Sequence, residues 1–117
     1  MYRVKAEIEQ LIDKFGGKSY HKGYHYLVRT IEKNLTNDTA APIIELQKEI
    51  AEEFGCTEYT VKRGVEVEVS RMAQGEESKE KLLRAFNGEV PSAKEFIWYI
   101  TRLLKGKERD ENKRERH

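Results

Sequence analysis

Cysteine, proline and long apolar runs are nearly absent from this sequence of 117 residues. Its one cysteine, Cys56, excludes an internal disulfide and is typical of proteins in a reducing compartment, so we expect a cytoplasmic protein. No run approaches the roughly 18 apolar residues of a membrane-spanning helix, so we expect no membrane partner. Because Pro42 and Pro91 are the only prolines, most of the chain is free to form helices.

The sequence also lacks an excess of charge of either sign. Lysine and arginine together number 22 against 21 aspartates and glutamates, which leaves a net charge of +1, and hydrophobic residues make up 38% of the chain. That hydrophobic share is enough for one packed core, and the length fits one domain. Dedicated nucleic-acid binders usually show a clearer basic excess, so the overall charge does not by itself point to DNA.

Apolar residues recur at helical spacing in six segments separated by glycine, proline or asparagine. The predicted helices cover about residues 4–15, 22–35, 42–54, 58–73, 77–86 and 92–104. Ser92 and Glu95 have the spacing of a capping box at the start of the last one. We therefore predict an all-α fold of about six helices in a compact bundle over residues 1–105. Residues 106–117 form a charged tail, whose lack of apolar side chains predicts disorder.

One segment carries a competing signal. Valine and glutamate alternate over residues 65–69, which is the period of a strand. The segments on both sides are helical by their apolar spacing, and a lone strand would have no partner in this chain. We therefore predict a helix through residues 65–69.

Residues 47–66 fit the spacing of a helix-turn-helix, in which two helices cross steeply through a turn of three or four residues. Ala51 is small enough for a close approach of the helices, Gly55 accepts a positive φ in the turn, and Thr57 can cap the second helix. The residues expected in the shared core are Ile50, Phe54, Val61 and Val65. The alternative is an ordinary helical hairpin with a glycine turn. We predict the helix-turn-helix, at about residues 43–73.

The outward face of the second helix would then be the DNA-reading surface. By helical phase it carries Glu58, Tyr59, Thr60, Lys62, Arg63 and Glu66. Arg63 can donate two hydrogen bonds to guanine, Lys62 can contact guanine or phosphate, and Glu66 can accept from cytosine or pair with Lys62. The alternative for this face is a solvated charged surface. Near the start of helix 22–35, Lys18, His21 and Lys22 are candidate contacts to DNA phosphates.

Three motifs, in this order, resemble one known family. They are His21-Lys22-Gly23-Tyr24-His25-Tyr26-Leu27, Ile50-Ala51-Glu52-Glu53-Phe54 and Ser92-Ala93-Lys94-Glu95-Phe96-Ile97. Over about residues 8–105 the sequence resembles the C-terminal DNA-binding effector domain of the sporulation master response regulator (stage zero sporulation protein A) family. The resemblance implies a six-helix fold with the helix-turn-helix in its third and fourth helices. It also implies a transcription regulator that reads the major groove with residues 58–73.

Departures from the family pattern lie in the reading helix. The family has Arg, Glu and Arg where this sequence has Thr60, Lys62 and Arg63, and an Arg-His pair where it has Glu66 and Val67. The family's own target sequence is therefore not implied. The sequence includes no receiver domain, so we expect a stand-alone effector. The expected partner is double-stranded DNA in the nucleoid, with RNA polymerase and a second copy of the chain on DNA as further candidates.

The alternative function is a protein-interaction module, or an antagonist, on the same fold and without specific DNA binding. The near-zero net charge and two acids on the fourth helix, Glu66 and Glu68, favour it. We expect no enzymatic activity, no cofactor and no metal site. His21 and His25 are spaced like zinc ligands on a helix, but Lys22 stands where the zinc-protease pattern has glutamate. Cys56 is expected to be a packing residue.

Overall fold

The computed structural model describes residues 2–37 and 41–115, with side chains over residues 4–37 and 41–106. Its helices are α1 (Tyr2–Lys14), α2 (Lys22–Leu35), α3 (Ile43–Phe54), α4 (Glu58–Met72), α5 (Glu76–Ala85) and α6 (Ala93–Glu115). The described residues contain no strand, and residues 65–69 lie inside α4. The predicted all-α fold of six helices is confirmed, as is the helical interpretation of residues 65–69.

Several helix boundaries follow from local signals in the sequence. α3 ends at Gly55, whose φ of 66° is left-handed and suits a residue without Cβ. α4 begins after Thr57, whose side chain accepts a hydrogen bond from the Thr60 amide at 3.1 Å. Ser92 and Glu95 exchange hydrogen bonds of 2.9 and 3.1 Å at the start of α6, which confirms the predicted capping box.

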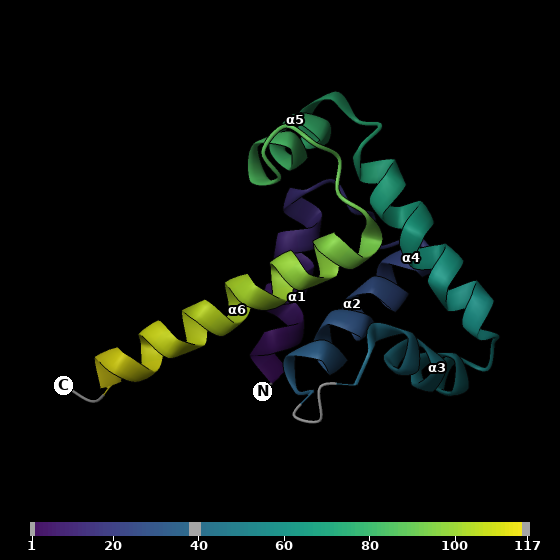
Figure 1. Ribbon diagram of the computed structural model, residues 1–117, viewed down its shortest axis with the longest axis horizontal. Coiled ribbons are helices and arrows are strands. Elements are labelled where there is room, and N and C mark those ends of the chain that lie inside the picture. The colour runs from purple at the N-terminus through teal and green to yellow at the C-terminus, as the bar shows by residue number, and fades with distance from the viewer. Residues whose placement is uncertain (1, 38–40, 116–117) are drawn as a thin grey trace.

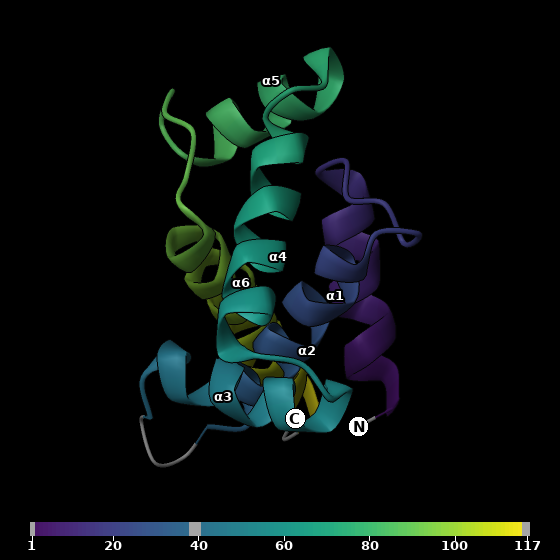
Figure 2. The ribbon, with the colours of Figure 1, turned by 90° about the vertical axis from the view of Figure 1, so that its right-hand side faces the viewer.

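α2 is the central helix of the bundle. It packs against α1, α3, α4 and α6, and Figure 2 shows it between α1 and α4. All six helices contribute apolar side chains to one core, and fully buried examples are Ile12, Leu27, Ile50, Val65, Leu82 and Phe96. Burial of this apolar surface is the main favourable contribution to folding. α4 runs along one side of the molecule from α3 to α5 (Figure 1).

Two glycines let α2 and α4 approach backbone to backbone. A Cβ atom at Gly23 would lie 2.2 Å from the carbonyl oxygen of Gly64. A Cβ atom at Gly64 would lie 2.7 Å from the Cδ2 atom of Tyr26. Both distances are shorter than van der Waals contact, so this helix separation requires glycine at both positions. The crossing places the first turn of α2 directly against α4.

The prediction that Phe54 lies in the core shared by α3 and α4 is wrong. Its side chain is 47% exposed, whereas Ile50, Val61 and Val65 are fully buried as predicted. Phe54 is the last residue of α3, and its ring meets the ring of Tyr26 edge-on with the centroids 5.2 Å apart. Because Tyr26 is itself buried and fills the space at this end of α3, Phe54 covers it from outside.

The structure describes helix over most of the segment predicted to be a disordered tail, because α6 continues to Glu115. In Figure 1 this end of α6 extends away from the rest of the bundle. Lysine, arginine and glutamate are strong helix formers and are frequent here, so a helix that begins in the core continues without an apolar face. Residues 116 and 117 of the predicted tail lie outside the described residues.

Candidate nucleic-acid interface

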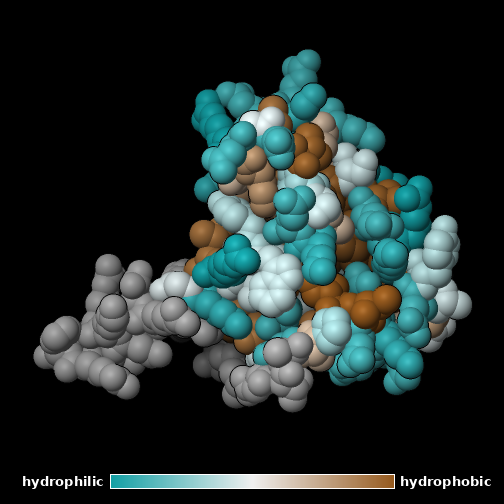
Figure 3. Space-filling view, in the orientation of Figure 1, coloured by the Kyte–Doolittle hydropathy of each residue, from teal (hydrophilic) through white to brown (hydrophobic). Residues whose placement is uncertain are grey.

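α4 has a buried face and an exposed face. Val61, Val65 and Val69 lie on the buried face and are at most 2% exposed. All six residues predicted to read DNA are exposed: Glu58, Tyr59, Thr60, Lys62, Arg63 and Glu66. In the space-filling view the side chains around α4 are mostly hydrophilic, with small apolar patches between them (Figure 3). Thr60, Lys62 and Arg63 are therefore open to a large ligand.

The turn between α3 and α4 is short and internally hydrogen-bonded. Only Gly55, Cys56 and Thr57 separate the two helices. The Cys56 amide donates a hydrogen bond of 2.9 Å to the carbonyl of Ala51, and the Cys56 thiol lies 3.9 Å from the hydroxyl of Tyr26. Ala51 is 3% exposed. These contacts fix the direction in which α4 leaves α3.

The glycine crossing brings the start of α2 beside α4 and leaves a groove between the two helices. The groove has a volume of about 530 Å³. Thr60, Arg63 and Arg71 line it from α4, and Lys22 lines it from α2. Three cationic side chains therefore gather around one concave surface. Such an arrangement is typical of surfaces that attract a polyanion.

Two exposed tyrosines lie at the same groove. Tyr59 of α4 is 72% exposed, and Tyr20, in the segment before α2, is 80% exposed. Tyrosine side chains combine an apolar ring with a hydroxyl group, and they are common at binding surfaces for that reason. The groove therefore offers both charge and aromatic surface to a ligand.

Not all six predicted α4 residues meet at this groove. Lys62 and Glu66 line a separate cleft of about 220 Å³, together with Ile44 of α3 and Lys94 of α6. The predicted DNA-reading face therefore has two edges. One edge faces α2 and the other faces α6, so a ligand that contacts all six residues must lie across the exposed ridge of α4.

The three predicted phosphate contacts lie at or beside the groove. Lys22 lines it, and Lys18 lines an adjoining cavity of about 670 Å³ that also borders α1 and α5. His21 lines both spaces and is partly buried. The structure therefore brings the segment before α2 and the exposed edge of α4 together.

Glu68 is a buried acid that sequence reasoning placed among surface acids. Its side chain is only 1% exposed. The Lys18 amide donates a hydrogen bond of 2.9 Å to Oε2, and Nδ1 of His21 lies 2.9 Å from Oε1. Arg71 also approaches Oε1, with its Nη1 atom at 3.6 Å. A buried carboxylate is tolerated when several donors surround it, as here.

The burial of Glu68 removes one reason for a protein-binding acidic face. Of the two acids on which that alternative relied, Glu66 is exposed and Glu68 is not. The sequence did contain a signal, because helical phase places Glu68 on the same stripe of α4 as Val61, Val65 and Met72.

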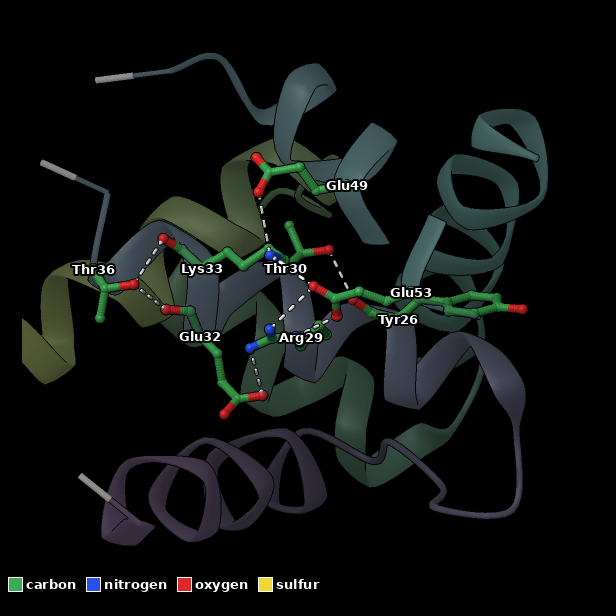
Figure 4. Close-up of polar contacts among 8 residues, drawn as sticks. All are labelled: Tyr26, Arg29, Thr30, Glu32, Lys33, Thr36, Glu49 and Glu53. Carbon is green, nitrogen blue, oxygen red and sulfur yellow. Dashed lines mark hydrogen bonds and ion pairs between the residues drawn. The ribbon is translucent and has the colours of Figure 1, made fainter. Parts of the chain in front are cut away.

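A network of ion pairs joins α2 to α3 and was not predicted from the sequence (Figure 4). Arg29 donates hydrogen bonds of 2.8 and 3.1 Å to the two carboxylate oxygens of Glu53. Lys33 lies 2.8 Å from Glu53 and 3.3 Å from Glu49. The hydrogen bonds from Arg29 and Lys33 lower the pKa of Glu53 from 4.5 to about 2. The network stabilises α3, and with it the turn that starts α4.

His21, which precedes α2, and His25, which lies within it, have separate partners. Nδ1 of His21 faces Glu68, whereas Nε2 of His25 donates a hydrogen bond of 2.7 Å to the carbonyl of Ser19. Within residues whose side chains the structure describes, no group of three or more His, Cys, Asp or Glu side chains could hold a metal ion.

None of the helices in the described part of the chain is both long and apolar enough to cross a membrane.

The exposed ridge of α4 and the cationic groove beside it are therefore the surface with the clearest capacity for ligand binding. Comparison of the chain with protein-family models, with curated proteins and with solved structures finds no match.

Proposed function

We propose that this protein binds double-stranded DNA and places α4 in the major groove. The observation that carries the proposal is the exposure of Thr60 and Arg63 in the first turns of α4, a helix that begins directly after a three-residue turn and adjoins a cationic groove. The major groove of DNA is about 12 Å wide and admits one helix. A helix that follows a tight turn and presents its first turns to solvent is suited to enter it.

In this arrangement Arg63 is the principal base-reading residue. Its guanidinium can donate two hydrogen bonds to O6 and N7 of guanine. Tyr59 and Thr60 lie on the same edge of α4 and can contact neighbouring bases, including the methyl group of thymine. Lys62 and Glu66 lie on the edge of α4 that faces α6. In the proposed complex they contact the opposite side of the DNA major groove.

Phosphate contacts would come from the start of α2. Lys22 lies at the groove beside Arg63, and Lys18 lies next to it in the adjoining cavity. Contacts of this type set the position of the protein on the duplex and carry no base information. Their strength falls with salt concentration because they release condensed counterions from DNA.

The sequence resemblance to the sporulation regulator family supports a role in transcription. Thr60, Lys62 and Glu66 differ from the family pattern on the exposed ridge of α4. We therefore propose a transcription regulator whose target sequence differs from that of the family.

Selection of duplexes from a randomised pool at low salt tests the proposal. We expect the protein to retain a subset of sequences, and Arg63→Ala to weaken binding to them roughly 5- to 150-fold, the effect of losing about 1–3 kcal/mol of guanine contact. Arg84→Ala is the matched control, since Arg84 is exposed on α5 at the far end of α4 (Figure 1), and it should leave binding unchanged. If the protein retains no duplex from the pool, it does not bind DNA and the protein-interaction alternative is favoured.

A further inference from the structure

Glu68 connects α4, the helix proposed to bind DNA, to the segment before α2. It lies on α4 four residues after Gly64, and its carboxylate is buried beneath that segment. One carboxylate oxygen accepts the Lys18 amide at 2.9 Å, and the other lies 2.9 Å from Nδ1 of His21. Glu68 therefore fixes both the backbone at residue 18 and the imidazole ring of residue 21.

The contact with Glu68 determines which nitrogen of His21 carries the first proton. A carboxylate only accepts hydrogen bonds, so Nδ1 is the donor and the neutral ring keeps a lone pair on Nε2. Nε2 has no hydrogen-bond partner among the described residues, and the ring lines the groove that also contains Lys22 and Arg63. Protonation of His21 therefore converts its free nitrogen from an acceptor into a charged donor.

We propose that Glu68 is a positioning residue that orients His21 to contact a DNA phosphate in its protonated form only. This inference rests on the proposed DNA binding. Phosphate oxygens accept hydrogen bonds and repel a lone pair, so the neutral ring held by Glu68 makes no favourable contact, whereas the imidazolium donates one. DNA binding then gains one phosphate contact at acidic pH.

Other ionisable groups surround His21, on every element near it. Lys18 and Tyr20 precede it, Lys22 follows it, and Glu68, Arg71 and Arg63 face it from α4. Across the adjoining cavity lie Asp13 and Lys14 of α1 and Glu76, Glu77 and Lys81 of α5. Substitution of His21, with His25 as the control, therefore decides whether a pH effect on binding comes from this ring.

The first experiment needs no DNA. Nitrogen-detected NMR of the imidazole rings in the full chain identifies which ring nitrogen is protonated, and His21→Gln assigns the His21 signals. We expect neutral His21 to carry its proton on Nδ1, and Glu68→Gln to change its chemical shifts and tautomer population. His25→Gln is the control, because a glutamine amide can still donate to the Ser19 carbonyl. A proton on Nε2 in the neutral ring, or no response to Glu68→Gln, overturns the positioning role.

The second experiment measures the affinity for a selected duplex against salt concentration at pH 5.5 and pH 8. One additional phosphate contact steepens the slope of log affinity against log salt by about 0.9. We expect this difference between the two pH values in the unchanged protein and in His25→Gln. His21→Gln and Glu68→Gln should both lose it. If the Glu68→Gln protein does not fold, the measurement rests on His21→Gln alone. The side chain of His21 is partly exposed, so we expect this variant to fold.

The possible results separate this inference from the proposed function. Equal salt slopes at both pH values, with tight duplex binding, overturn the inference and leave DNA binding in place. A pH-dependent slope that persists in His21→Gln also overturns it. If no duplex binds at either pH, the proposed function fails, and the phosphate contact of His21 fails with it.

Discussion

α2 makes two contacts of opposite character with the helices of the proposed DNA-binding unit. Against α4 it packs through Gly23 and Gly64, where a missing side chain allows the backbones to touch. Against α3 it uses Arg29 and Lys33, which form ion pairs with Glu53. The first contact depends on shape and is buried, and the second depends on charge and is partly exposed to water.

This difference shows how each helix is held. The position of α4 tolerates almost no added volume, because a new side chain would meet backbone atoms that cannot move independently. α3 is held in part by buried residues such as Ile50, but its ion pairs with α2 are screened by solvent and salt, so each pair is worth little on its own. Substitutions at the two contacts should therefore differ in size and in their response to pH and salt.

The largest effect is expected from Gly23→Ala. The added Cβ would lie 2.2 Å from the carbonyl oxygen of Gly64, so α2 and α4 must separate. We expect a loss of about 3 kcal/mol in the free energy of unfolding, at the upper end of the usual range for overpacking. Denaturant unfolding measures it. Gly106→Ala on α6 is the control, because nothing lies within 4 Å of the new Cβ, and it should gain about 0.5–1 kcal/mol from helix propensity.

Gly64→Ala should have a smaller effect at the same contact. Its Cβ would meet the ring of Tyr26, at 2.7 Å from Cδ2, and a ring can tilt where a backbone cannot. Alanine also favours the helix by about 1 kcal/mol, so we expect a net loss of about 1–2 kcal/mol. The same unfolding experiment compares the two variants. A larger loss for Gly64→Ala than for Gly23→Ala would show that Tyr26, and not the backbone contact, limits the helix separation.

Glu53→Gln tests the charged contact and should cost about 1 kcal/mol at pH 7. The pKa of Glu53 is lowered from 4.5 to about 2, so its ion pairs stabilise the fold above pH 4.5 and lose this effect as the pH falls toward 2. The difference in unfolding free energy between the two proteins should therefore disappear over that interval. Glu52→Gln is the control, since Glu52 is exposed and no ion pair involves it among the described residues. A constant difference between pH 6 and pH 2 would contradict this account.

The smallest effect is the response to salt. Raising the salt concentration from 0.05 to 1 M should reduce the stabilisation by Glu53 by about 0.5 kcal/mol, because screening weakens exposed ion pairs. The penalty of Gly23→Ala should not change, since it has no electrostatic component. Unfolding of the two variants at both salt concentrations, each relative to the unchanged protein, gives this comparison. An equal salt response of the two variants would mean that both contacts share one mechanism.

Helix positions were largely predictable from the sequence, for a physical reason. Apolar spacing and caps such as Thr57, Ser92 and Glu95 act between residues in the same turn or the next, so neighbouring letters contain the information. The exposed face of α4 follows from the same periodicity. Phe54 is the exception in this group, because periodicity does not reveal that Tyr26 already fills the site at the end of α3.

Some signals in the sequence could be interpreted only once the contacting residue was known. Gly64 interrupts a helical segment, and an isolated glycine in a helix often marks a close contact. The sequence does not say that the contact is with Gly23. Glu68 lies on an apolar stripe, which requires a donor from elsewhere in the chain, and the structure supplies Lys18 and His21.

The sequence alone determined six helices, caps such as Thr57 and Ser92, and the six α4 residues predicted to face solvent, because each depends on interactions within one helix. Tertiary structure decided the glycine crossing of α2 and α4, the ion pairs between α2 and α3, and the groove that joins Lys22 to Arg63. It also decided the link from Lys18 to Glu68, which are 50 residues apart in the chain. Such contacts depend on how helices pack in three dimensions, and no local pattern encodes that arrangement.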